Sequence, residues 1–170
     1  MELHWVILGN GTTARGILAR PIPPNIRFIS QNRVYPYGTN DAVVVSRPEY
    51  LPHLPRDIDR STVYVPAAWP PEMGYNRVDA PANCLHMTMA LLARWGVSRA
   101  CALGWDGIAL DEPTASQPYP DAVAQSNRGL KDGTKRWRRN LLEAQRATRV
   151  ITLHICTAGE FDRWIARTHK

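Results

Sequence analysis

A short apolar run near the start of the chain, residues 4–8, ends in the polar turn Gly9-Asn10-Gly11. An apolar run followed by closely spaced glycines predicts a strand, a tight turn and a helix start, the junction where α/β folds bind nucleotides. The glycines permit positive φ angles and a close approach of a ligand to the backbone, and Asn10 supplies an amide. Thr12 or Thr13 can cap the helix, whose first N–H groups attract phosphate. The junction favours a nucleotide site; the alternative is a turn that holds no ligand.

The turn departs from two common nucleotide-binding motifs. The dinucleotide fingerprint is Gly-x-Gly-x-x-Gly, and the sixth position counted from Gly9 is Ala14. No acidic residue follows at about twenty positions, where the fingerprint places a ribose ligand. The Walker pattern Gly-Lys-Ser/Thr does not occur anywhere in the sequence. An ordinary NAD-dependent enzyme or a P-loop kinase is therefore not expected.

Length and composition predict one domain over residues 1–170, because 170 residues with 44% hydrophobic content can bury one sizeable core. The sequence has no apolar run of the roughly 18 to 20 residues that cross a bilayer. It also lacks an amino-terminal basic region followed by a long apolar stretch. We therefore expect a soluble, cytoplasmic protein with no membrane span. The formal net charge of +6 favours anionic partners: nucleotides, nucleic acid or phosphorylated sugars.

The three cysteines, Cys84, Cys101 and Cys156, are far apart and odd in number. Each lies in a predicted helix or strand, which suits buried thiols in a reducing compartment. A structural zinc site is not expected, and no metal ligand is assigned.

Apolar segments alternate with helical patterns along the rest of the chain. The helical pattern over residues 83–97 places Leu85, Met89, Leu92 and Trp95 on one face, and Gly96 ends it. A segment rich in proline and glycine, from Asp111 to Gly133, has no periodicity and predicts a long loop, of the kind that forms lids. The alternation predicts an α/β fold with a single doubly wound, mostly parallel sheet. Further strands are expected over residues 26–30, 42–46, 62–66, 98–107 and 150–157, and further helices over 136–148 and 160–168.

Several segments together resemble the bacterial sialyltransferases that use CMP-sialic acid. The family opens with a strand and a Gly-Asn-Gly turn, as residues 6–14 do, and continues to a strand of the form Phe-x-Cys-Asn-Gln, matched here by residues 28–35. A strand ending in Asn corresponds to residues 42–49. A helix that turns into a strand ending Gly-x-Asp corresponds to residues 87–108, and the closing helix and strand correspond to residues 140–158. The order and approximate spacing agree over most of the chain.

The resemblance implies a metal-independent glycosyltransferase with a Rossmann-like, GT-A-type core, which binds a CMP-sugar across the carboxyl ends of the strands. The nucleotide-sugar is then a co-substrate, and no resident cofactor is expected. By the resemblance Gly9, Asn10, Gly11 and Thr12 face the nucleotide phosphate and ribose. Gln31 or Asn32 contacts the sugar or the phosphate. Ser46 takes the position of an Asn that contacts the base.

Two family motifs are altered in this sequence. The Thr-Ser-Gly that holds the donor carboxylate is replaced by Ala82-Asn83-Cys84, so a different sugar or nucleotide is easier to accommodate, with Asn83 facing it. The predicted lid, residues 111–135, contains no histidine to act as general base. The candidate substitutes in this segment are Tyr119, Asp121, Lys131 and Lys135. Asp121 is the candidate that deprotonates an acceptor hydroxyl, and a Lys or Arg is the candidate to stabilise the leaving phosphate. Asp106 lies at the end of a predicted strand and either faces the ligand or is a turn residue.

Three functional hypotheses follow. The first is a sialyltransferase-like glycosyltransferase that moves a sugar from a nucleotide-sugar, with a CMP-sugar favoured, to a glycan, a nucleotide or DNA. The second is a catalytically inactive nucleotide- or nucleic-acid-binding module of the same fold. The third is an interaction protein that uses a basic helix, and the sequence also leaves homo-oligomerisation open. The basic residues either follow a nucleic-acid backbone or form a solvated helix face; they are Lys131, Lys135, Arg136, Arg138 and Arg139, with Trp137 among them.

Overall fold

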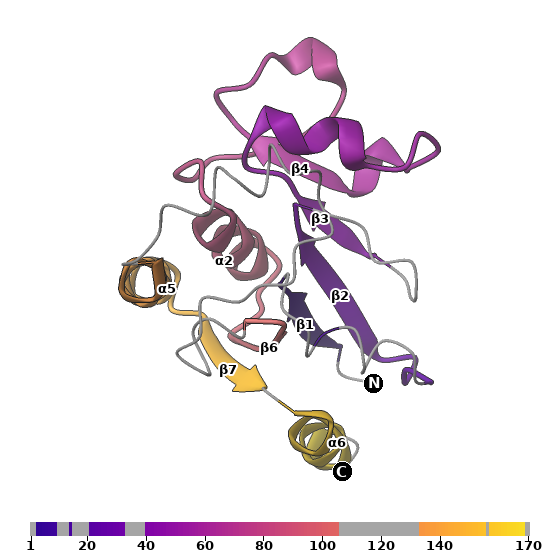
Figure 1. Ribbon diagram of the computed structural model, residues 1–170, viewed down its shortest axis with the longest axis vertical. Helices are drawn as coiled ribbons and strands as arrows, with labels where there is room; N and C mark the ends of the chain where they lie inside the picture. Colours follow the sequence, from indigo (N-terminus) through magenta and orange to yellow (C-terminus); the bar gives the residue numbers. More distant parts are fainter. Residues whose placement is uncertain are drawn as a thin grey trace.

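A seven-stranded, wholly parallel sheet organises the protein (Figure 1). A computed structural model describes residues 3–9, 14, 21–32, 40–105, 133–155 and 157–168. The strand order is β5-β4-β3-β2-β1-β6-β7, and each neighbouring pair is parallel. The strands are β1 His4–Leu8, β2 Ile26–Gln31, β3 Ala42–Val44, β4 Val63–Pro66, β5 Asn76–Val78, β6 Arg99–Leu103 and β7 Ile151–Ile155.

The strand order reverses once, between β1 and β6. From β1 the chain adds β2, β3, β4 and β5 toward one edge, and then returns to place β6 and β7 on the other side of β1. In open α/β sheets such a reversal separates the connections at the carboxyl ends of the two strands and leaves a crevice there. This Rossmann-like, doubly wound topology confirms the predicted fold class.

Helices cover both faces of the sheet. Helix α2 (Cys84–Arg94) and helix α5 (Gly133–Thr148) pack on one face, and helix α6 (Ala158–Thr168) packs on the other (Figure 1). Three 3-10 helices, η1 (Pro48–His53), η2 (Arg60–Thr62) and η3 (Pro71–Met73), belong to the connections between β3, β4 and β5.

The core follows the period-two alternation of the strands. In β1, Ile7 packs toward α2 and α5, whereas Val6 and Leu8 pack with Phe161 of α6. All three β1 side chains are at most 1% exposed. Burial on both faces explains why the strands are continuous apolar runs rather than alternating patterns, and why they were predictable from the sequence.

The structure agrees with the expected elements in order and refines their bounds. Gly96, at φ 74°, ends the α2 segment as expected. Strand β5 was not predicted, because it has three residues of which only Val78 is buried. Helix α5 begins at Gly133, so the expected lid, 111–135, was too long at its carboxyl end, since glycine and threonine are acceptable in a first helical turn. Residues 111–132 lie outside the described residues.

Candidate site at the carboxyl edge of the sheet

Polar residues gather where β2 and β3 end and α2 begins. Gln31 is the last residue of β2, Asn32 follows it, Ser46 lies two residues beyond β3, and Asn83 caps α2. Gly9 follows β1 at the same edge. These five predicted site residues are therefore all at the carboxyl edge; Gly9 lies at the reversal of strand order, and the other four lie on the β2 and β3 side of it. The other six lie outside the described residues: Asn10, Gly11, Thr12, Asp106, Tyr119 and Asp121.

Asn32 joins the ends of β2 and β3. Its backbone N–H donates to the carbonyl of Val44 at 2.8 Å, and its side-chain Oδ1 accepts from the N–H of Ser46 at 3.2 Å. Its φ of 61° lies in the left-handed region, where asparagine is more readily accommodated than most residues. The residue that was predicted as a ligand contact or a turn cap therefore has a definite structural role.

Gln31 connects β2 to α2. Its Nε2 donates to Thr88 Oγ1 at 3.1 Å and to the carbonyl oxygen of Cys84 at 3.4 Å. Gln31 is 7% exposed and Thr88 is fully buried. Sequence reasoning did not find Thr88, because a single threonine on the apolar face of a helix gives no pattern of its own.

Asn83 places the amino terminus of α2 at the site. Its backbone is extended, and its Oδ1 accepts from the N–H of Leu85 at 2.9 Å, which is the hydrogen bond of an N-cap. Its carbonyl accepts from Met87 at 2.9 Å, the first bond of the helix. The positive end of the helix dipole therefore faces the carboxyl edge and favours negative charge there.

Cys84 and Ser46 complete the cluster. The thiol of Cys84 donates to Ser46 Oγ at 3.0 Å. Burial raises the pKa of the Cys84 thiol, and hydrogen bonds with Ser46 and Asn32 and the charge of Arg47 offset this only in part. The thiol is therefore protonated near neutral pH, where it is a hydrogen-bond donor rather than a nucleophile.

Gly9 has a packing role at the end of β1. Its N–H donates to the carbonyl of Leu103 at 2.8 Å, and a Cβ at this position would overlap the Trp105 side chain and the Gly104 carbonyl. The positive φ angles of the described glycines fall elsewhere, one of them at Gly104 with φ 70°. The end of the neighbouring strand therefore requires a glycine here, and positive φ is not the reason for it.

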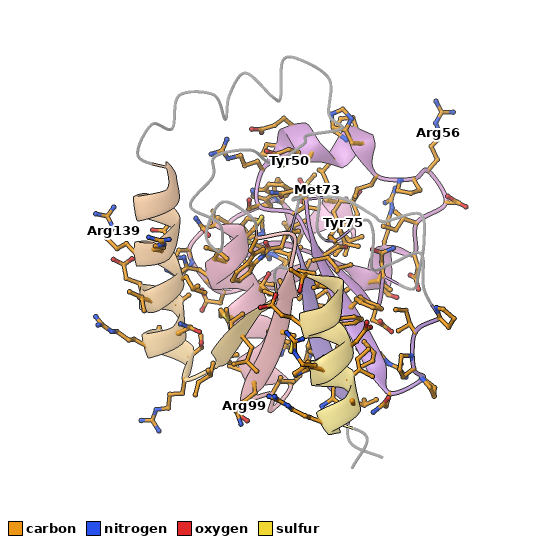
Figure 2. The ribbon with its side chains drawn as sticks, turned by 60° about the horizontal axis from the view of Figure 1, so that its bottom comes forward. Tyr50, Arg56, Met73, Tyr75, Arg99 and Arg139 are labelled. Carbon is orange, nitrogen blue, oxygen red and sulfur yellow. The ribbon has the colours of Figure 1, made fainter. Side chains whose placement is uncertain are left out.

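The basic helix α5 contributes no described hydrogen bond to the polar cluster. Its Leu141 and Ala144 are buried in the core beside α2, and Arg139 is exposed and pairs with Glu143 at 3.9 Å. Figure 2 shows Arg139 extending outward from α5. Of the basic residues singled out in the sequence, Arg138 and Arg139 are exposed, and the side chains of residues 133–137 lie outside the described part of the chain.

Comparison with known proteins gives no relative: no protein-family model, curated protein or solved structure matches the chain. Among the described helices, none combines the length and apolar character needed to cross a bilayer. The same described residues contain no group of three or more His, Cys, Asp or Glu side chains that could hold a metal ion.

Proposed function

We propose that the polar cluster at the carboxyl edge binds a nucleotide, and that the protein is a sialyltransferase-like glycosyltransferase that moves a sugar from a nucleotide-sugar to an acceptor. The cluster consists of Gln31, Asn32, Ser46, Asn83, Cys84 and Thr88. The observation that carries the proposal is the concentration of buried polar groups at this edge. Gln31, Ser46 and Thr88 are each at most 9% exposed, and they surround the start of α2. Core packing does not require polar groups at these positions, and a few fixed polar groups of this kind are what orients a polar ligand in a binding site.

The electrostatics of the edge suit a phosphate-bearing ligand. The amino terminus of α2 supplies partial positive charge, and Arg47 follows Ser46 directly. Arg47 lies 3.7 Å from Glu49, and both side chains are exposed enough for water to weaken this pair. The net charge of +6 attracts anions over a longer range.

The transfer step rests on the sequence resemblance. Sugar transfer needs a base that accepts the proton of the acceptor hydroxyl and a group that stabilises the departing phosphate. Asp121 is the predicted base, a Lys or Arg such as Lys131 or Lys135 is the predicted phosphate-stabilising group, and Tyr119 is a further predicted catalytic residue. A CMP-sugar is the donor that the resemblance favours, and the acceptor is a glycan, a nucleotide or DNA.

A binding study with a matched pair of variants tests the nucleotide site. Melting temperatures are measured with CMP, UMP, AMP, GMP and their sugar conjugates, because a ligand that binds only the folded state raises this temperature. Ser46→Ala removes a hydroxyl from the cluster. Ser61→Ala makes the same change at an exposed residue before β4, at the opposite end of the sheet.

We expect one base to raise the melting temperature of the parent and of Ser61→Ala by several degrees, and to raise that of Ser46→Ala much less. Failure of every nucleotide and nucleotide-sugar to stabilise the parent would reject the proposal. An equal rise in the melting temperatures of the two variants would show that the cluster does not bind the nucleotide.

A second candidate function, nucleotide binding without transfer, is favoured by the chemistry of residues 83 and 84. The Oδ1 of Asn83 is used in capping α2, and the thiol of Cys84 is protonated, so neither acts as a base. Release of free CMP from a CMP-sugar, measured with and without acceptor, separates the two. Sugar transfer above the buffer rate rejects the second candidate, and stabilisation without turnover supports it.

A further inference from the structure

The Gln31 amide has one kind of hydrogen-bonding capacity left. A glutamine side chain carries two N–H donors and one carbonyl oxygen that accepts. Both donors of Gln31 have partners within the protein, Thr88 Oγ1 at 3.1 Å and the carbonyl of Cys84 at 3.4 Å. No described residue donates a hydrogen bond to its Oε1. What Gln31 has left to offer is therefore an acceptor.

The orientation of this amide follows from its partners. The Cys84 carbonyl can only accept a hydrogen bond, so the nitrogen of Gln31, and not its oxygen, must face it. Thr88 is fully buried in α2 and Gln31 is 7% exposed, which leaves the side chain little freedom to turn. A reversed amide would place its oxygen against the Cys84 carbonyl and lose that hydrogen bond.

We infer that Gln31 Oε1 accepts a hydrogen bond from a donor group of the ligand, and that Thr88 is a positioning residue: the Cys84 carbonyl sets which way the amide faces, and the shorter hydrogen bond to Thr88 holds it in place. This inference rests on the proposed function, because it concerns the nucleotide at the same edge. The resemblance allowed Gln31 to contact either the sugar or the phosphate. Because a carbonyl oxygen repels a phosphate, the free acceptor of Gln31 favours the sugar. The ligand donor is either an exocyclic amine of the base or a sugar hydroxyl.

Each of the two possible donor groups implies a different preference among ligands. If the donor is an amine, the site prefers cytosine over uracil, because uracil presents a carbonyl where cytosine presents an amine. If the donor is a hydroxyl, the site prefers a ribose or sugar that retains it over the deoxy analogue. An acceptor left facing another acceptor lowers affinity by about tenfold to a hundredfold.

Dissociation constants measured by calorimetry distinguish the two possible donor groups, the base amine and the sugar hydroxyl. One arm compares CMP with UMP, and the other compares CMP with its 2′-deoxy and 3′-deoxy analogues. The variants are Thr88→Val, which removes the hydroxyl that holds Gln31, and Thr88→Ser, which retains it. Thr62→Val is the matched control, because the Thr62 hydroxyl donates to the Asp59 carbonyl at 2.7 Å in an exposed turn.

We expect the parent to discriminate by at least about tenfold in one arm. Thr88→Val should reduce that ratio to within about threefold, because the amide then keeps only the longer hydrogen bond to the Cys84 carbonyl, at 3.4 Å, and its Oε1 is no longer held in one place, while Thr88→Ser and Thr62→Val preserve it. Equal affinities in both arms, or an unchanged ratio in Thr88→Val, would overturn the inference while nucleotide binding itself still stands. Absence of binding by the parent would overturn both.

Gln31→Met is a second variant that does not depend on the folding of Thr88→Val. It fills similar volume without any hydrogen-bonding group. We expect it to bind nucleotides with the discrimination lost, since the acceptor itself is gone. Discrimination equal to that of the parent would assign the preference to another residue and overturn the inference.

Discussion

Two parts of the same sheet edge have opposite character. At the ends of β1 and β6, Gly9 and Gly104 bring the two chain segments together against Trp105, and this contact is closed by backbone and an aromatic ring. At the ends of β2 and β3, Gln31 and Ser46 meet the start of α2 through polar side chains. Packing accounts for the glycine at the first place. It does not account for the polar groups at the second, which therefore carry more information about a ligand.

The polar cluster is nearly self-sufficient in hydrogen bonds. A buried polar group without a partner is costly, but Gln31, Thr88, Cys84 and Ser46 satisfy one another. Such a set adds little net stability compared with apolar residues of the same shape. It holds particular atoms in particular places, which is what recognition of a ligand needs.

The largest expected effect concerns Gly9. Gly9→Ala should lower the free energy of unfolding by about 3 kcal/mol, because the added Cβ overlaps the Gly104 carbonyl and the Trp105 ring. Urea unfolding followed by circular dichroism measures it.

Gly159→Ala is the matched control for this change. In α6 the new Cβ meets only Arg163 Nη1, at 3.8 Å, so this variant should gain about 0.5 kcal/mol. If Gly9→Ala is as stable as the parent and only loses ligand binding, the packing explanation of Gly9 is wrong and the contrast between the two places disappears.

The next effect concerns Gln31 and Thr88. Thr88→Val should cost about 2 kcal/mol, because it leaves an N–H of Gln31 buried without its partner. Combining it with Gln31→Leu should cost clearly less than the sum of the single changes, with a coupling of about 1 kcal/mol. Urea unfolding of the parent, the two single variants and the double variant measures this coupling as a double-mutant cycle. Additive costs would show that the two side chains do not act as a pair.

Two substitutions of Asn83 distinguish its role in capping α2 from a role in ligand binding, and their effects are smaller. Asn83→Ala should cost about 1 kcal/mol through loss of the N-cap. Asn83→Asp keeps the cap and suits the helix dipole, so its stability should match the parent. The new charge should nevertheless weaken CMP binding by about tenfold or more through repulsion of the phosphate. Unchanged affinity in Asn83→Asp would place the phosphate away from α2.

The smallest effect is a dependence of stability on pH. Below the ordinary thiol pKa of about 8.5, Cys84 is neutral in both the folded and unfolded states. Above it the unfolded thiol ionises, whereas burial raises the pKa in the folded state, so the free energy of unfolding falls as pH rises. The parent should therefore lose more stability than Cys84→Ser between neutral pH and mildly alkaline pH. Cys101, whose pKa burial also raises, is present in both proteins and cancels. Parallel pH profiles from urea unfolding would contradict this.

The sequence predicted those parts of the fold that depend on continuous apolar runs. Buried strands such as β1 and β6 are recognisable because both of their faces lie in the core, and Gly96 ended a helix whose apolar face was already periodic. Strand β5 escaped prediction because its pairing with β4 depends on hydrogen bonds of the main chain, which side-chain type does not report.

The candidate site was predictable only in its position along the chain. Gln31, Ser46 and Asn83 were each identified at an element end, and the carboxyl ends of parallel strands meet at one edge. The contacts that decide their roles join residues far apart in sequence, as Gln31 and Thr88 are, and no local pattern encodes those. The packing role of Gly9 was not predicted for the same reason: the residues that a Cβ at Gly9 would meet follow β6, far away in the sequence.

The proposed nucleotide lies at the edge formed by β2, β3 and the start of α2. The most direct test is an NMR titration of the ¹⁵N-labelled protein with CMP, following each backbone amide. We expect saturable shifts at Asn32, Ser46 and Cys84, and no shift at Ser61, which precedes β4 at the opposite end of the sheet. No saturable shift at any amide, or shifts that leave those three residues unchanged, would contradict it.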